Sequence, residues 1–272
     1  MTHSITILGC GSSGGVPRIG NDWGQCDPAN PKNRRRRCSA VVTRKSAHGE
    51  TRVLIDTSPD MREQILSQGV ADIDAVLFTH EHADHTHGID DLRAFFLLKR
   101  KRVDIWADDA TGRMLTTRFT YCFYSAPGSD YPPILNLNPM EAGKPVTIGG
   151  AGGEIAALPF QVHHGTIDAL GFRIGAMAYT PDIDGVPEHS LHALENLDLW
   201  IVDALRRTPH PSHWSLPQTL EWIARMKPKR AILTNLHVDL DFATLAAELP
   251  AGIEPCLLYT SPSPRDQRGS RM

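Results

Sequence analysis

The sequence predicts an α/β protein in which strands and helices form one layered domain. Three observations favour this fold class. The 272 residues suffice for a single large domain with its own core. Apolar runs typical of strands alternate with helical patterns along the chain. Many short strands and few long helices, with no internal repeat and no long linker, favour a layered arrangement over separate domains.

The elements follow from the spacing of apolar residues. Strands are predicted at residues 4–8, 39–43, 52–56, 75–79, 103–106, 145–148, 154–160, 171–174, 176–180, 198–203 and 230–234. Helices are predicted at residues 60–67, 89–99, 108–122, 188–195, 216–226 and 242–248. Ser215 and Gln218 form a capping signal before LEWIARM, and Asp241 is a suitable N-cap for FATLAAEL. Glycine and proline between residues 126 and 153 predict a surface loop and a hairpin.

Composition narrows the class of protein. Hydrophobic residues make up 41% of the chain and charged residues 22%, and the formal net charge of −3 points to neither nucleic acid nor membrane. No apolar run reaches the roughly 18 residues of a spanning helix, and the N-terminus lacks a signal-peptide pattern, so we expect a cytoplasmic protein. The five scattered cysteines predict reduced thiols.

The last residues have an unusual composition. The segment CLLYTSPSPRD, from residue 256, resembles the translation of an adapter used in sequencing libraries. We interpret residues 256–272 as a non-native translated scar, with a disordered tail as the alternative, and residues 1–255 as the single domain.

The glycine-rich segment GCGSSG, residues 9–14, matches the G-x-G-x-x-G spacing of a dinucleotide-binding turn. In such folds the third glycine opens a helix whose N-terminus holds the pyrophosphate. Here prolines and glycines follow instead and exclude that helix: Pro17, Gly20, Gly24, Pro28 and Pro31. The segment therefore predicts a loop and not an NAD site.

A denser cluster follows the strand AVLFT. The segment HEHADH has the form H-x-H-x-D-H and places His80, His82, Asp84 and His85 on one tight turn. Imidazoles and a carboxylate suit Zn²⁺, Mn²⁺ or Fe²⁺, and ligands alternating along a turn can serve two adjacent ions. The alternative is a solvated histidine-rich turn.

Further candidate ligands follow later strands. The run ALPFQVHHG ends in His163 and His164, MAYTPD ends in Asp182, and AILTNLH ends in His237. Each could be an ordinary polar residue on its own, but together with the cluster they complete a seven-ligand set.

With these residues the sequence resembles the metallo-β-lactamase superfamily, in its phosphodiesterase branch. That branch includes phosphoribosyl cyclic phosphate phosphodiesterases and, more distantly, ribonuclease Z. The likeness covers residues 3 to about 255 and includes GCGSSGGVPR, CSAVV, the H-x-H-x-D-H motif, H-G, PD and the LH before V-D. It implies an αββα sandwich of two mixed sheets packed face to face with helices outside. It also implies that the glycine-rich loop borders the active site.

The resemblance implies roles for individual residues. One divalent ion would be held by His80, His82 and His164, and a second by Asp84, His85 and His237, with Asp182 bridging. His164 is preferred to His163 because it directly precedes the glycine. Asp56, which ends the strand RVLID, would orient the histidine turn, or would be an ordinary turn aspartate.

The segment PHPSHWSLPQ contains a further candidate. In the phosphodiesterase branch a histidine of this loop donates a proton to the leaving oxygen. His213 is the best match, His210 is the second choice, and an ordinary loop histidine is the alternative. The implied reaction is attack of a metal-bridging hydroxide, oriented by Asp84, on a phosphodiester. The cofactors would be two ions of Zn²⁺ or Mn²⁺, and the substrate a small cyclic phosphate or nucleotide-like diester.

Two features depart from the family. Where the cyclic phosphodiesterases have a cysteine-rich zinc knuckle, this chain has WGQCDPANPKN with only Cys26, so no structural zinc is expected there. A basic run follows, and it is interpreted either as a solvated loop or as a rim that attracts phosphate: Arg34, Arg35, Arg36 and Arg37.

Other functions stay open. The same fold hosts thioesterases and lactonases, and the metal ligands alone do not exclude them. A ribonuclease Z-like enzyme is less favoured because the net charge is negative and no inserted RNA-binding arm is evident, so long RNA is not expected as a partner. A non-catalytic relative, like those of quinone-cofactor biosynthesis, is the third alternative. The oligomeric state, including a homodimer, is left open, and no membrane partner is expected.

Overall fold

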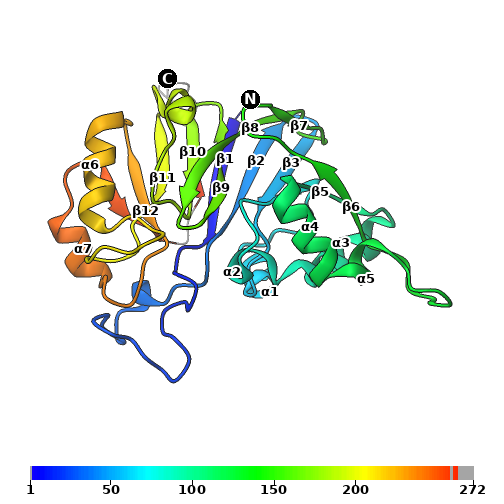
Figure 1. Ribbon diagram of the computed structural model, residues 1–272, viewed down its shortest axis with the longest axis horizontal. Helices are drawn as coiled ribbons and strands as arrows, with labels where there is room; N and C mark the ends of the chain where they lie inside the picture. The colour runs from blue at the N-terminus through cyan, green and yellow to red at the C-terminus, as the bar shows by residue number, and fades with distance from the viewer. Residues whose placement is uncertain (1, 258–259, 263–272) are drawn as a thin grey trace.

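Figure 1 shows a computed structural model that describes residues 2–257 and 260–262. Two seven-stranded sheets lie face to face, and helices cover the outer face of each sheet. This is the αββα sandwich that the resemblance implies, which confirms the predicted fold class.

The first sheet has the order β14-β1-β2-β3-β4-β5-β6. Neighbours from β14 to β3 run antiparallel and those from β3 to β6 run parallel. Its strands are β1 (Thr2–Gly9), β2 (Ser39–Ser46), β3 (Gly49–Ile55), β4 (Ala75–Leu77), β5 (Val103–Ala107), β6 (Leu135–Pro139) and β14 (Thr260–Pro262).

The second sheet has the order β13-β12-β11-β10-β9-β8-β7. Like the first sheet, it has one antiparallel part and one parallel part. Neighbours from β7 to β10 run antiparallel, and those from β10 to β13 run parallel. Its strands are β7 (Val146–Ile148), β8 (Ile155–His164), β9 (Ile167–Ile174), β10 (Met177–Thr180), β11 (Leu199–Asp203), β12 (Ala231–Thr234) and β13 (Ile253–Pro255).

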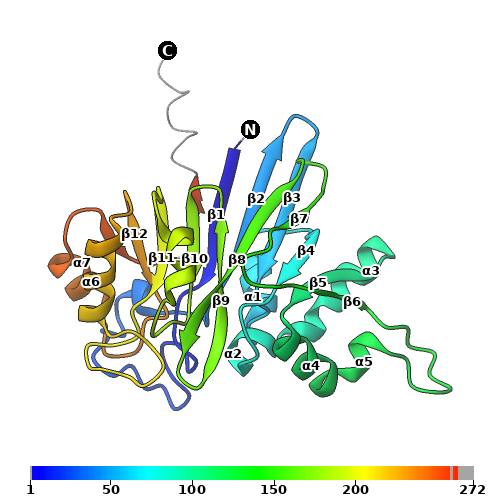
Figure 2. The ribbon, with the colours of Figure 1, turned by 45° about the horizontal axis from the view of Figure 1, so that its top comes forward.

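Helices form the two outer layers, which Figure 2 shows on opposite sides of the sheets. The first sheet is covered by α1 (Met61–Ser67), α3 (Arg93–Lys99), α4 (Asp109–Arg118) and α5 (Thr120–Phe123). The second is covered by α6 (Leu216–Met226), α7 (Phe242–Glu248) and the 3-10 helix η3 (Glu188–Leu194). The remaining short helices are α2 (Ala83–Thr86), η1 (Pro31–Asn33) and η2 (Ile89–Leu92). No helix among the described residues is long and apolar enough to cross a membrane.

Strand periodicity explains why the apolar runs are continuous. In β3, Val53 and Ile55 pack into the core between the sheets, while Leu54 packs under the helices of the outer layer. In β11, Ile201 enters the central core and Trp200 faces α6 and α7. Successive side chains point to opposite faces, so strands buried on both faces need apolar residues at every position.

The local signals give mixed results. The Ser215–Gln218 capping box is present, and the Asp241 carboxylate accepts a hydrogen bond from the Thr244 amide at 3.0 Å, so both caps are confirmed. The predicted helix at 188–195 is wrong in type, because residues 188–194 form the 3-10 helix η3. Strand β6 was also missed: its sequence LNLNP has Asn and Pro, which an edge strand tolerates.

The C-terminal segment is described only in part. Cys256 is buried in the central core, and β14 pairs with β1. Residues 258–259 and 263–272 lie outside the described residues, and the interpretation of 256–272 as a scar stays a prediction.

Candidate metal centre

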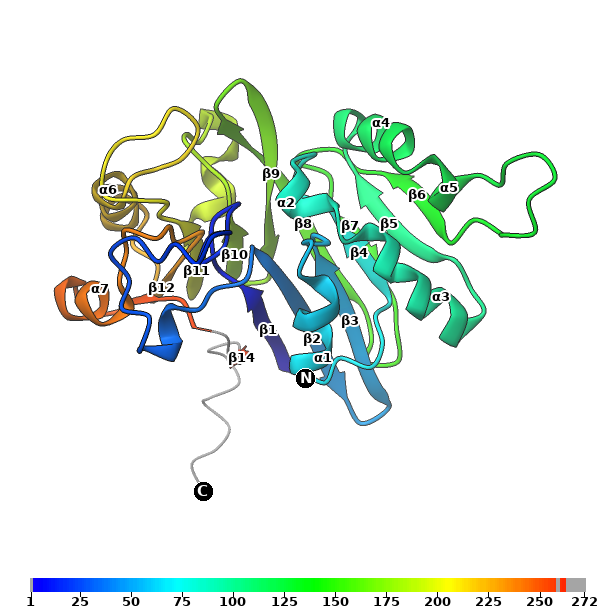
Figure 3. The same ribbon diagram turned by 90° about the horizontal axis from the view of Figure 1, so that it is seen from below.

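The site is built where strands of both sheets end at one edge of the sandwich, the end seen from below in Figure 3. The His80–His85 turn follows β4 and runs into α2, whose N-cap is His82. Asp56 follows β3, the parallel neighbour of β4. From the second sheet, His164 ends β8 and Asp182 follows β10. Because parallel strands end at the same edge, residues far apart in sequence meet there.

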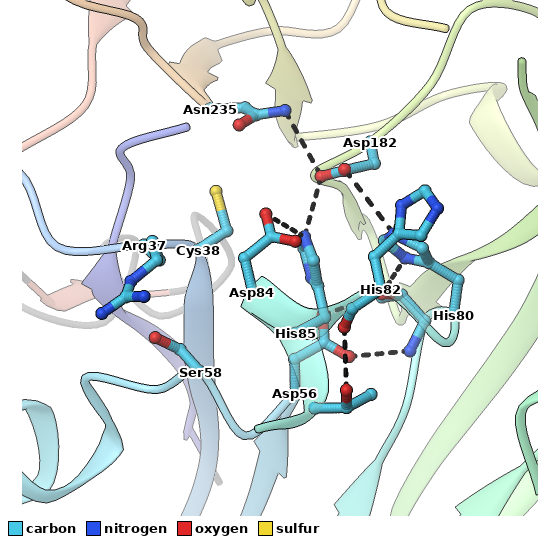
Figure 4. Close-up of polar contacts among 12 residues, drawn as sticks. Arg37, Cys38, Asp56, Ser58, His80, His82, Asp84, His85, Asp182 and Asn235 are labelled. Atoms are coloured by element: carbon cyan, nitrogen blue, oxygen red, sulfur yellow. Dashed lines mark hydrogen bonds and ion pairs between the residues drawn. The ribbon is translucent and has the colours of Figure 1, made fainter. Parts of the chain in front are cut away.

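Asp56 holds the histidine turn in place. Its buried carboxylate accepts hydrogen bonds from the amide and hydroxyl of Thr79, both at 2.8 Å, and lies 2.7 Å from Nδ1 of His85 (Figure 4). Its backbone φ is 61°, in the left-handed region that few non-glycine residues adopt. A strained residue whose carboxylate contacts Thr79 and His85 fits the orienting role and not that of an ordinary turn aspartate.

Four side chains form the first group of metal-ligand type. His80, His82, His164 and Asp182 offer donor atoms that all lie within 4.8 Å of one another. Nδ1 of His82 lies 3.0 Å from Nε2 of His80 and 3.0 Å from Nε2 of His164. Three imidazoles and a carboxylate match the donor set of zinc-type sites.

Asp84, His85 and Asp182 form the second group. Nε2 of His85 lies 3.1 Å from Oδ1 of Asp182 and 3.5 Å from Oδ2 of Asp84. The other oxygen of Asp182, Oδ2, lies 3.5 Å from Nε2 of His164 in the first group. Asp182 therefore faces the two groups with different oxygens, as a bridging carboxylate would.

Two of the donor imidazoles are in the neutral state that metal binding requires. Burial lowers the pKa of His80 well below its usual value and also lowers the pKa of His164, which leaves both imidazoles neutral. Burial alone would raise the pKa of Asp182, but the facing His85, His213 and His80 lower it well below the usual value.

His85 supplies an independent test of the fit. Its Nε2 atom is buried and makes no hydrogen bond among the described residues, although two carboxylates face it. Burial would lower the pKa of this imidazole, but Asp182, Asp84 and Asp56 together raise it well above its usual value. Positive charge is thus favoured at this point, and a divalent cation could take the place of the proton. The residues present fit bound metal ions.

His237 lines the same cavity as Asp84. Among the described residues, neither the first group nor the second group includes the His237 side chain. Its Nδ1 lies 3.1 Å from Oδ1 of Asp239, and its Nε2 lies 3.5 Å from a guanidinium nitrogen of Arg18. An imidazole held at Nδ1 by a carboxylate, with Nε2 directed away, has the usual orientation of a metal-ligating histidine.

His213 points into the centre and His210 does not. Nε2 of His213 lies 3.9 Å from Oδ2 of Asp182, and its ring centroid lies 4.6 Å from that of His164. His210 accepts a hydrogen bond from the Ser212 amide and its ring is 5.1 Å from that of His213. His163 is exposed beside Asp168, whereas His164 is buried and its Nδ1 lies 2.6 Å from the Ser212 carbonyl oxygen.

Asp203 belongs to the candidate site, and the sequence analysis missed it. It ends β11, is fully buried, and its Oδ2 lies 2.7 Å from Nδ1 of His213. Burial would lower the pKa of His213, but the charge and hydrogen bond of Asp203 outweigh this and raise it to about 9. An aspartate directly after an apolar run, like Asp56, was the available signal.

A cavity of about 260 Å³ adjoins these residues. Its lining residues are Ser12, Ser13, Gly14, Arg18, Asp84, Leu205, Arg206, His210, His213, Asn235 and His237. The glycine-rich segment therefore borders the site, and no helix follows it before η1, as predicted.

Both interpretations of the basic run are wrong for Arg35. Arg35 is only 3% exposed and donates to main-chain oxygens, so it belongs neither to a solvated loop nor to a rim open to phosphate. Arg37 donates to both carboxylate oxygens of Asp60, and Arg36 donates to the Ser67 hydroxyl. The guanidinium of Arg34 lies over the Trp23 ring. The structure gives each of these side chains a partner within the protein.

A four-layer αββα fold with paired His/Asp groups at one edge defines the metallo-β-lactamase class of hydrolases. The profile of the β-lactamase superfamily domain matches residues 51–235, and the chain belongs to this superfamily.

Solved structures show the same relationship. A diphosphatase of the PhnP family is 33% identical, with a TM-score of 0.86 over 96% of this chain and 97% of that one. Zinc-bound PqqB from Methylobacterium extorquens is 17% identical, with a TM-score of 0.69 over 95% of this chain and 99% of that one. Human tRNase Z, short form, is 14% identical, with a TM-score of 0.59 over 95% and 98%. The last two show the fold alone, and the first supports the phosphodiesterase branch.

The curated relatives are longer proteins. An octanoyltransferase of Porphyromonas gingivalis is 31% identical over 233 residues, which cover 85% of this chain and 45% of that protein. Coenzyme PQQ synthesis protein B of Xanthomonas oryzae is 30% identical over 174 residues, which cover 58% and 51%. The chain spans about half the length of the curated relatives it matches.

Proposed function

We propose that this protein is a phosphodiesterase that depends on two divalent ions, Zn²⁺ or Mn²⁺, and hydrolyses a small phosphodiester. The observation that carries the proposal is the His213–Asp203 pair. It directs an imidazole toward the bridging carboxylate Asp182 at the wall of a polar cavity. Phosphodiester hydrolysis needs a proton for the departing alkoxide, and this imidazole is placed to give it.

The two His/Asp groups would hold the ions, with His237 as a further ligand of the second. Ions bound there would supply Lewis acidity, which polarises phosphoryl oxygens and lowers the pKa of a bound water. Asp84 lines the cavity and would orient the attacking water as well as ligate.

His213 would act as the general acid. Asp203 holds its Nδ1, so the proton available for transfer sits on Nε2, the nitrogen that faces Asp182. Asn235 adds a second contact 3.1 Å from Nδ1. Held in this orientation, the imidazole can protonate the leaving oxygen, and the product is a phosphomonoester.

One observation favours a thioesterase as the second candidate. The relative from Porphyromonas gingivalis is an octanoyltransferase, and acyl transfer of this kind uses activated esters or thioesters. The cavity argues against an eight-carbon chain, because arginines, histidines and serines line it and Leu205 is the one apolar side chain among its described lining residues. The small polar cavity also fits a small diester better than long RNA.

The test compares the two substrates on one metal-counted sample. Protein loaded with Mn²⁺ or Zn²⁺ is assayed against bis(p-nitrophenyl) phosphate and against p-nitrophenyl octanoate, with Asp182→Ala as the inactive control. About two ions per chain and turnover of the phosphate diester would support the proposal. Turnover of the octanoate alone would establish the second candidate. A protein without ions or turnover would point to a non-catalytic scaffold.

A further inference from the structure

Arg35 is buried in the loop that crosses from the glycine-rich segment to β2, and the proposed mechanism does not use it. The residue is 3% exposed, and among the described residues no carboxylate forms an ion pair with it. Its Nε atom has no hydrogen-bond partner there either. A buried guanidinium with only neutral partners costs free energy, so its contacts are informative.

The guanidinium of Arg35 forms hydrogen bonds to both ends of one turn. It donates to the carbonyl oxygen of His237 at 3.3 Å and to that of Leu240 at 2.6 Å. The turn between them is closed by the Leu240 amide, which donates to the same His237 carbonyl at 3.2 Å. Asp239, within the turn, faces Nδ1 of His237. Arg35 therefore fixes the segment that aims the His237 ring.

The backbone of Arg35 ties this turn to the segment that follows the glycine-rich loop. Its amide and carbonyl exchange two hydrogen bonds with Val16, each 2.9 Å, directly after the glycine-rich segment. Its Cβ lies so close to Gly11 that a side chain at position 11 would approach it to 2.9 Å. Arg35 thus joins the loop of Ser12 to Gly14 with the turn of His237, and both line the cavity.

Asn33 extends the connection to α7. Its buried side-chain amide donates to Asp241 at 2.6 Å, and its oxygen accepts from the Phe242 amide at 2.7 Å and from Arg35 at 3.4 Å. Since Asp241 caps α7, the turn after β12 is held from both sides.

We propose that Arg35 is a positioning residue that sets His237 as a ligand of the second ion. The inference rests on the two-ion function proposed above. Arg35 contacts the His237 turn and none of the members of the first group. Its loss should therefore weaken one ion site and spare the other. A residue that only stabilised the fold would affect both sites together.

The experiment titrates metal-free protein with Mn²⁺ by calorimetry. For Arg35→Met we expect the second affinity to fall about 10–100-fold, as for other residues that orient metal ligands, with the first affinity unchanged. His237→Ala should give the same pattern. Arg35→Lys, which keeps the charge but lacks the planar fork of guanidinium donors, should be intermediate. Arg36→Met is the matched control and should match wild type, because the Arg36 guanidinium donates to the Ser67 hydroxyl and the substitution leaves the backbone of Arg36 in place.

The outcomes separate this inference from the proposed function. Two ions in wild type and two equally tight ions in Arg35→Met would overturn the positioning role alone. Equal weakening of both sites in Arg35→Met and Arg35→Lys would also overturn it. A wild type that binds a single ion would overturn the two-ion function and with it the inference. Absorption of the Co²⁺-loaded forms, which reports coordination number, gives the second readout.

Discussion

Nδ1 of His213 lies 2.7 Å from Oδ2 of Asp203, a carboxylate that is completely buried at the end of β11. The Ile183 amide donates to the same oxygen at 3.2 Å, while Oδ1 has no hydrogen-bond partner among the described residues. Burial raises the pKa of Asp203 to about 7 although the facing imidazole opposes this. The pair thus shares one proton beside the two His/Asp groups.

Replacing His213 by alanine should lower kcat much more for diesters with poor leaving groups than for diesters with good ones. A poor leaving group such as methoxide needs the proton, so kcat should fall about 10²–10⁴-fold. p-Nitrophenolate leaves without help, and its rate should change little. The measurement compares kcat for methyl p-nitrophenyl phosphate and for a dialkyl diester. His210→Ala is the control, and equal losses for both substrates would exclude the acid role of His213.

Replacing Asp203 by asparagine should move the pH profile. The raised pKa of His213, about 9, keeps the acid form present at lower pH and loses it as pH rises through that value. Bound cations lower the pKa of His213 and so shift the alkaline fall of the pH profile to lower pH. Removing the negative charge of Asp203 should shift this fall further in the same direction. The profile of kcat/KM for a dialkyl diester tests this. Asp168→Asn, which alters the exposed His163–Asp168 pair, should leave the profile in place.

Removing the ions should destabilise the fold. Ligands that bind only the native state add about 2.7 kcal/mol at a hundredfold excess over Kd, so EDTA should lower the Tm by several degrees. Asp182→Asn should be insensitive to EDTA, since the carboxylate shared by both groups is gone. Thermal unfolding with and without chelator measures the difference. A wild-type Tm that is indifferent to both EDTA and added Mn²⁺ would contradict the metal centre.

Gly88 is required behind the histidine turn. An added Cβ there would come within 2.1 Å of the Ser58 carbonyl oxygen. Because this oxygen belongs to the backbone, a change of side-chain rotamer cannot relieve the clash. Gly88→Ala should therefore cost about 1–3 kcal/mol in urea unfolding. Gly149→Ala, where a Cβ would meet nothing within 4 Å, is the control. An unchanged midpoint for Gly88→Ala would mean that the turn can shift freely.

The candidate site could be predicted best where several metal-ligand residues lie close together in the sequence. The spacing of His80, His82, Asp84 and His85 has few uses other than metal binding, and strand-end positions could be found for His164 and Asp182. Asp203 escaped notice because a single aspartate after an apolar run is common. Arg35 was grouped with its neighbours because a run of like charges normally lies in solvent, and only tertiary contacts distinguish it. The relation of His237 to the second group depends on a turn whose shape local sequence does not specify.

The donor atoms come from both halves of the chain. His80 to His85 belong to the first sheet's half, and His164 and Asp182 to the second. Neither half alone carries a complete group, so tight metal capture must wait until the sheets have docked. During synthesis the chain would leave the ribosome with its early histidines unpaired. Either group would be complete only after the segment that carries Asp182 had emerged and the two sheets had packed together.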